Sequence, residues 1–289
     1  MNIRAGKVSA WLRSGWTAAG TAGLRFVLVG LALFVVVALL GPVVWRQNPL
    51  AINLTAVLRP PSASHPFGTD EYGRDVLARF LGGARLSLLL GVGAVAGGAL
   101  IGLVLGAFGG LVGGLIDSVI SRTLDGVLAF PALIMGLGFA LAIGASGLSA
   151  ALAVMIAGVP WYARVVRSEV LSLRSRDFID AERALGAPRL LILRRHIITS
   201  VTGGLTVQAS LGVAYAVLAI AGLGFLGLGV RPPTPEFGAM ITEGRDYLLS
   251  GQWWIAIFPG VGLLVLVGLS LALGEALRDQ LDPYGKLSY

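Results

Sequence analysis

Cysteine is absent from the 289 residues, and only 13% of them are charged, against about a quarter in typical soluble domains. The missing cysteines exclude disulfide bonds, thiolate nucleophiles and metal sites with cysteine ligands. With 56% hydrophobic residues and a mean hydropathy of +0.84, the chain has too little polar surface to cover a soluble core of its size. These shortages indicate a membrane protein.

Six apolar runs approach or exceed the length that crosses roughly 30 Å of hydrocarbon as a helix. They cover about 26–45, 87–110, 127–144, 148–163, 203–230 and 253–274, and none contains Asp, Glu, Lys, Arg or His. The first run lacks a clear cleavage site, so we interpret it as a retained span rather than a signal peptide. The sequence therefore predicts an all-α membrane protein with six transmembrane helices.

The uncharged runs also weaken several functional classes. Proton-coupled and ion-coupled carriers usually place ionisable groups at mid-membrane, and a hydrolase or metalloenzyme in the bilayer needs them too. The two histidines, His65 and His196, lie in different connecting segments, so we predict neither a catalytic nor a metal site. The GxGxxG match at 222–227 lies inside an apolar run, without the preceding strand that a dinucleotide site requires. No Walker A motif is present, so energy for uphill transport would come from another chain or from an ion gradient.

Positive charge predicts the orientation, because cytoplasmic segments carry an excess of Lys and Arg. Segments 1–25, 111–126 and 164–200 and the C-terminal tail together hold 15 Lys and Arg, whereas 46–86 and 231–252 hold 7. Both termini are therefore expected in the cytoplasm of a multi-pass protein of the inner or plasma membrane.

The organisation follows from these segments. We expect a cytoplasmic N-terminal tail over 1–25 and a first span with an extracytoplasmic segment over 26–86. A five-span core over 87–277, which includes the cytoplasmic loop 164–200, and a cytoplasmic tail over 278–289 complete the chain.

Glycine recurs every fourth residue in the second run, at Gly98, Gly102, Gly106 and Gly110. On a helix this spacing makes a smooth stripe that another backbone can approach closely. We predict helix packing there; a pore-lining role is compatible with it.

The cytoplasmic loop contains a short helix signature in 177–196. Asp177 is placed to cap a helix start, and Phe178, Ala181 and Leu185 follow at helical spacing as an apolar face. Gly186 supplies a left-handed stop, and a basic helix is expected from Arg189. Such a knob suits a groove on a cytoplasmic partner, but a linker helix held by arginines to lipid phosphates explains it equally well.

Outside the membrane, residues 68–79 are polar and interrupted by glycine. Asp70 or Asp75 is expected to pair with Arg74 or Arg79 and brace a turn, although contact with an exported protein or with cargo is an alternative.

Four segments together are similar to one family. Residues 180–187 (DAERALGA) resemble the EAA loop of binding-protein-dependent ABC importer permeases, and 65–79 (HPFGTDEYGRDVLAR) resemble the signature of the C-type subunit of dipeptide, oligopeptide and nickel importers. Segments 231–247 and 274–283 match the same family in the same order. The set covers nearly the whole chain from residue 65.

The resemblance implies a type I importer permease fold, with a second homologous permease, two ABC ATPase subunits and an extracytoplasmic substrate-binding protein as partners. Membrane lipid would surround the spans, and no nucleic acid is involved. The chain would be non-catalytic and bind no cofactor, since ATP and Mg would be used by the partner ATPases. The residues that match the ATPase-coupling loop are Asp177, Asp180, Ala181, Glu182, Arg183, Leu185 and Gly186. Those that match the extracytoplasmic motif are Gly68, Thr69, Asp70, Gly73, Arg74 and Asp75.

The chain departs from the family pattern at two places. Asp180 stands at the usual Glu and Glu182 at the usual second Ala, and Ile198-Thr199 replace the common Leu-Pro. Peptides fit the resemblance best as cargo. Nickel complexes or another small solute remain open, and a self-sufficient carrier or channel is the alternative of a different class.

Overall fold

The computed structural model describes residues 5–186, 188, 195 and 197–281. Its elements are helices in the order α1 (Ala5–Val44), the 3-10 turn η1 (Leu54–Ala56), α2 (Val76–Val112), α3 (Gly114–Leu128), α4 (Ala132–Ile143), α5 (Gly147–Arg174), α6 (Asp177–Ala184), α8 (Ile198–Phe225), α9 (Phe237–Arg245) and α10 (Trp254–Leu281). Within the described ranges, the extended pairing is limited to an isolated antiparallel bridge between Thr69 and Asp75. The fold is that of an all-α membrane protein.

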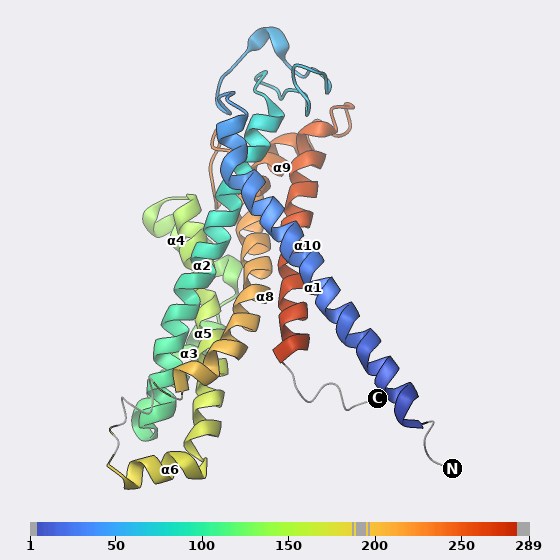
Figure 1. Cartoon of the computed structure of the whole chain (residues 1–289). Helices are drawn as coiled ribbons and strands as arrows, with labels where there is room; N and C mark the ends of the chain where they lie inside the picture. Colours follow the sequence, from blue (N-terminus) through green and yellow to red (C-terminus); the bar gives the residue numbers. More distant parts are fainter. Residues whose placement is uncertain (1–4, 187, 189–194, 196, 282–289) are drawn as a thin grey trace.

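Five helices are long and apolar enough to cross a membrane: α2, α5, α8, α10 and the Gly23–Val44 part of α1. They form a bundle in which α2 packs against α5, and α8 packs against α2, α5 and α10 (Figure 1). The C-terminal part of α1 crosses α2 and α10 diagonally on the outside of this bundle (Figure 1).

The continuous span expected over 127–144 is wrong. α3 ends at Leu128, α4 begins at Ala132, and the two helices are bent by 88°, so a sixth crossing exists only if the pair is counted as one broken span. Pro131 explains the break, because it has no N–H to donate and it disfavours helical geometry at Phe130. With 12 residues, α4 is only ~18 Å long, too short to cross the hydrocarbon alone.

The other expected spans are present with different ends. α2 begins at Val76 rather than near residue 87, because the Asp75 carboxylate accepts a hydrogen bond from Ala78 N (2.8 Å) and caps the helix. Arg79 in its first turn is paired with Asp70 and Glu243, so the helix can begin before the apolar run.

The glycine stripe of α2 faces α5. A Cβ atom at Gly102 would lie 2.5 Å from Tyr162 Cβ and 2.8 Å from Ala163 N, and one at Gly110 would lie 2.8 Å from Val170 Cγ1. Gly98 and Gly106 make equally close approaches to the α5 backbone. Because these neighbours are backbone atoms and atoms close to the backbone of α5, the two helices leave no room for side chains of α2 along this seam.

The polar elements gather at opposite ends of the bundle. Residues 46–75 and α9 cover one end, which we call the cap, whereas α6 projects from the other end (Figure 1).

Candidate functional site

The helix predicted from Asp177 is present as α6. It has eight residues and ends at Ala184, and Gly186 follows with φ +84°, a left-handed conformation that favours glycine. A turn through Ser175 and Arg176 joins it to α5, with Ile179 N donating to Arg176 O at 3.0 Å. The helix is therefore attached directly to the end of a span.

The helix buries a residue outside the predicted apolar face, whereas the described members of that face, Phe178 and Leu185, are exposed. Ile179 is 1% exposed, whereas Phe178 is 44% and Leu185 88% exposed. Leu185 lies beyond the end of the helix, so the helical spacing that grouped it with Phe178 and Ala181 does not apply. Contact with the neighbouring spans decides which side of α6 is buried, and this contact selects Ile179.

The remaining residues of the predicted coupling loop, from Asp177 to Arg183, lie in the same helix. Asp177 is exposed and Glu182 is half-buried. Asp180, Ala181 and Arg183 belong to the α6 backbone, but their side chains lie outside the described part of the chain, as does the basic segment expected from Arg189.

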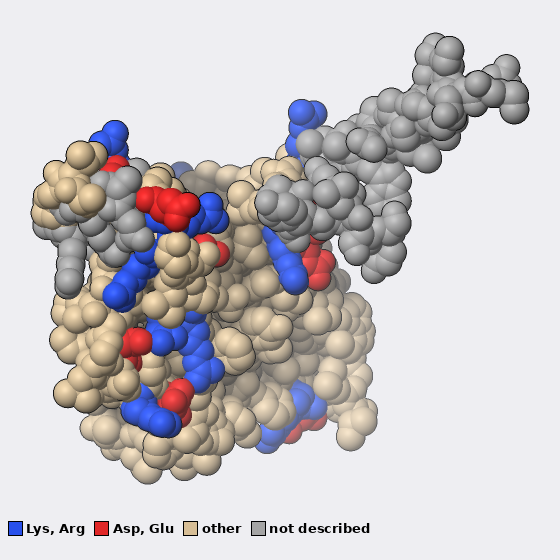
Figure 2. Space-filling model, turned by 90° about the horizontal axis from the view of Figure 1, so that it is seen from below, with Lys and Arg blue, Asp and Glu red and all other residues tan. Residues whose placement is uncertain are grey.

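Two ion pairs hold α3 against α5 near the same end. Arg167 donates two hydrogen bonds to the Asp117 carboxylate, from Nε and Nη2 at 2.6 Å each, and Arg164 Nη2 lies 2.7 Å from Asp125 Oδ1. Figure 2 shows that charged side chains on this end of the molecule gather mainly on one side, around a hollowed surface. Both acidic groups of segment 111–126, which was predicted to be cytoplasmic, are thus paired within the chain.

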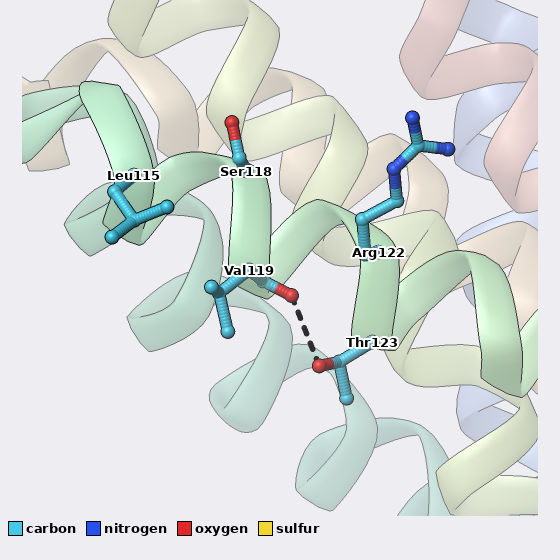
Figure 3. Close-up of a pocket in the computed structure, with 5 residues that line it drawn as sticks. All are labelled: Leu115, Ser118, Val119, Arg122 and Thr123. Carbon is cyan, nitrogen blue, oxygen red and sulfur yellow. Dashed lines mark hydrogen bonds between the residues drawn. The ribbon is translucent and has the colours of Figure 1, made fainter.

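The opposite side of α3 carries a shallow open hollow of about 470 Å³. Leu115, Ser118, Val119, Arg122 and Thr123 line it, and Thr123 Oγ1 donates to Val119 O at 3.0 Å (Figure 3). The guanidinium of Arg122 points away from Leu115 and Val119 (Figure 3). The lining offers no pair of groups for acid–base or nucleophilic chemistry.

In the cap, a buried network of charges braces the predicted turn. Asp70 accepts a hydrogen bond from Arg74 Nε at 2.6 Å and lies 3.4 Å from Arg79 Nε, and all three residues are at most 3% exposed. Arg74 also lies 3.1 Å from Glu71 and 3.5 Å from Glu243. The second oxygen of Glu71, Oε2, is buried without a hydrogen-bond partner among the described residues.

This network perturbs the Glu71 carboxyl. Burial raises the pKa of Glu71, and the neighbouring carboxylates of Asp70 and Glu243 add to the rise. Its own backbone amide and Arg74 oppose this shift but do not cancel it.

The glycines of the cap motif stand where the chain approaches itself. Gly68 (φ +73°) and Gly73 (φ +70°) adopt left-handed conformations, and a Cβ atom at Gly68 would lie 2.7 Å from both Arg59 O and Trp254 Nε1. The Trp254 indole donates to Thr69 O at 3.0 Å. The motif thus joins the cap to the start of α10.

Asp75 connects three segments through one carboxylate. Besides the α2 cap, it accepts a hydrogen bond from Trp45 Nε1 at 2.9 Å, and His65 Nδ1 lies 2.9 Å from its other oxygen. The end of α1 and the start of α2 are therefore fastened to each other.

Sequence reasoning missed three residues. Ile179 was passed over in favour of Phe178 and Leu185. Glu243 pairs with Arg79 from 164 residues away, and Glu236 (1% exposed) caps α9 while accepting from Ser87 Oγ at 2.9 Å. Both acids lie in the segment 231–247 that was recognised by its resemblance, which is the only signal that pointed to them.

The described residues contain no cluster of three or more histidine, aspartate and glutamate side chains placed to hold a metal ion. The cap carboxylates are directed at arginines, so the chemistry of this donor set favours ion pairing over metal coordination.

Comparison with known proteins gives a consistent result. Residues 98–283 match the family described as "Binding-protein-dependent transport system inner membrane component". A probable D,D-dipeptide transport system permease protein of Escherichia coli K12 is 39% identical over 254 residues, covering 88% of this chain and 85% of that protein. A dipeptide transport system permease protein of Alkalihalophilus pseudofirmus is 40% identical, covering 90% and 86%. The inward-facing MetNI methionine ABC transporter has a chain with TM-score 0.55 at 21% identity, covering 68% of this chain and 94% of that one, which shows a shared fold.

Proposed function

The chain belongs to the family of binding-protein-dependent transport system inner membrane components, and we propose that it is a transmembrane permease subunit of an ABC importer for di- and oligopeptides. The observation that carries this proposal is the similarity, over about nine-tenths of the chain, to permeases named for dipeptide transport. The chain would form half of a translocation pathway and perform no chemistry itself.

A second homologous permease would complete the pathway. Two ABC ATPase subunits would bind ATP and Mg and dock on the cytoplasmic side, and an exported binding protein would deliver cargo from outside. With no ionisable residue in the predicted spans, the pathway would discriminate little between charged solutes, so specificity would lie mainly in the binding protein.

The loop at α6 would couple this chain to the ATPases. Its short helix projects from the bundle, its Phe178 and Leu185 side chains are exposed, and glycine sets the turn that ends it. Amphipathic helices of this kind dock in partner grooves. ATP binding would close the ATPases, carry α6 with them and open the spans outward, and hydrolysis would reverse the change.

The distribution of Lys and Arg supports an orientation with both termini and α6 in the cytoplasm and the cap outside. The cap would then lie where the binding protein arrives.

The test is purification in mild detergent followed by reconstitution. We expect two ATPases and a second permease to co-purify, and proteoliposomes with the binding protein to take up a dipeptide only when ATP is present. Uptake of nickel but not of dipeptide would overturn the assignment of cargo. Uptake by this chain alone, without ATP, would establish a self-sufficient carrier instead.

A further inference from the structure

In the described part of α6, the side chain of Ile179 is buried among the spans. Among the α6 side chains that the structure describes, Asp177, Phe178 and Ala184 are exposed and Glu182 is half-buried, whereas Ile179 is 1% exposed. Ile179 therefore connects α6 to the interior of the bundle.

Ile179 belongs to a buried cluster that three spans share. The other buried members are Val166, Val170 and Leu173 from α5, Ala107 from α2, and Ile197 with Val201 at the start of α8; Leu103, Leu111 and Leu205 pack against the cluster. Val166, Val170 and Val201 are fully buried. We call this set the Ile179 cluster.

The spans on one side of this cluster cannot separate easily. α2 approaches the α5 backbone closely at Gly102 and Gly106, and Gly110 lies against the Val170 side chain of the cluster. Close-packed interiors transmit displacement instead of absorbing it. A shift applied through Ile179 to α5 is therefore shared with α2.

The same cluster also includes the start of the third span. Ile197 is 1% exposed and directly precedes α8, and Val201 lies one turn into that helix. Ile179 thus lies among the cytoplasmic ends of α5 and α8, the two spans that the loop 175–197 connects.

We propose that Ile179 is the positioning residue through which α6 displaces α2, α5 and α8 together, separate from the exposed residues of α6 that would contact the ATPase. This inference rests on the proposed function, because it assigns the transmission of movement within the same importer. Phe178 and Leu185 would determine whether the ATPase binds, whereas Ile179 would determine whether its movement reaches the spans.

The test uses the complete importer in proteoliposomes, with its binding protein and a dipeptide. Uptake and ATP hydrolysis are measured together for Ile179→Ala, Ile179→Val and the control Ile116→Ala, which truncates an exposed isoleucine of α3. For Ile179→Ala we expect dipeptides imported per ATP to fall at least about fivefold, the lower end of usual coupling energies, with the ATPases still bound. Ile179→Val, which removes one methylene, should stay within about twofold of the original protein.

Each other outcome is decisive. An unchanged ratio in Ile179→Ala overturns the inference, as does loss of the ATPases from that variant, which would make Ile179 a docking residue. If the alanine variant does not accumulate, Ile179→Val is compared with Ile179→Thr, in which a hydroxyl replaces one methyl group of valine. Equal numbers of dipeptides imported per ATP in these two variants would overturn the inference. Absence of ATP-driven uptake in the unsubstituted importer would overturn the proposed function and this inference with it.

Discussion

Arg79 in the first turn of α2 forms an ion pair with Glu243 of α9, 164 residues further along the chain. The arginine is 2% exposed and also donates to Pro233 O at 3.1 Å, so it joins α2 both to the segment that precedes α9 and to the C-terminal part of α9. The cap is therefore held by charges that are out of contact with water.

Removing one partner of this buried pair should be strongly destabilising. For Glu243→Ala we expect a loss of about 3 kcal/mol in the free energy of unfolding, because a buried guanidinium loses a carboxylate partner. The pair Arg245–Asp246 provides the control, since both side chains are more than half exposed and Asp246→Asn should cost about 0–1 kcal/mol. Thermal unfolding of the purified protein measures both, and equal shifts would contradict the buried role of Arg79.

Glu71 should make the stability of the cap depend on pH. Its pKa is raised in the folded protein, so its neutral form favours folding: the benefit is present below the unfolded pKa near 4.5 and is lost as pH rises toward the folded value. Glu71→Gln keeps a neutral side chain at every pH. The melting temperature of this variant, relative to the original protein, should therefore rise as pH increases from 4 to 7. A constant difference across that range would show that Glu71 titrates normally.

Adding even one methyl group to the seam between α2 and α5 should destabilise the protein. Gly102→Ala places a Cβ atom against Tyr162 and the Ala163 backbone, and overpacking of this kind costs roughly 1–3 kcal/mol. Gly93 on the same helix has nothing within 4 Å of its would-be Cβ, so Gly93→Ala should be neutral or stabilise by about 0.5–1 kcal/mol. Melting temperatures of the two variants should move in opposite directions, and similar values would argue against the close contact.

Gly186 should be needed for its conformation alone. Its φ of +84° costs other residues roughly 1–2 kcal/mol, while the space around it is open. In the reconstituted importer, Gly186→Val is expected to insert normally but to lower uptake per ATP, whereas Gly186→Asn, which tolerates left-handed geometry, should retain most of it. Full coupling in the valine variant would count against a docking role for this turn.

The orientation can be tested because the chain has no cysteine of its own. Ala184→Cys on α6 should react with a membrane-impermeant maleimide only after cells are opened. Leu249→Cys, at a fully exposed position between α9 and α10, should react in intact cells. The reverse pattern would place α6 outside and exclude contact with ATPases.

The long apolar helices were predictable because length and hydropathy alone define them. The start of α2 was not, since hydropathy treats Arg79 as a residue that ends a span, whereas distant carboxylates compensate its charge. The break before α4 was visible as Pro131, but the apolar residues around it concealed its effect.

Site residues were predictable to the extent that they interact locally. Asp70 with Arg74, four residues apart, and the stop at Gly186 follow from neighbouring positions. The burial of Ile179 does not follow from neighbouring positions, because it depends on how the spans of its cluster approach α6.

The hydrogen bond from Trp45 to Asp75 limits how early in synthesis the end of α1 can be fastened. Synthesis proceeds from the N-terminus, so α1 emerges from the ribosome before the residue that fastens it. Trp45 can donate to Asp75 only after 30 further residues have been added, when α2 is just beginning. Until then this hydrogen bond cannot fix the end of the first helix, and the packing of that helix against α10 forms later still.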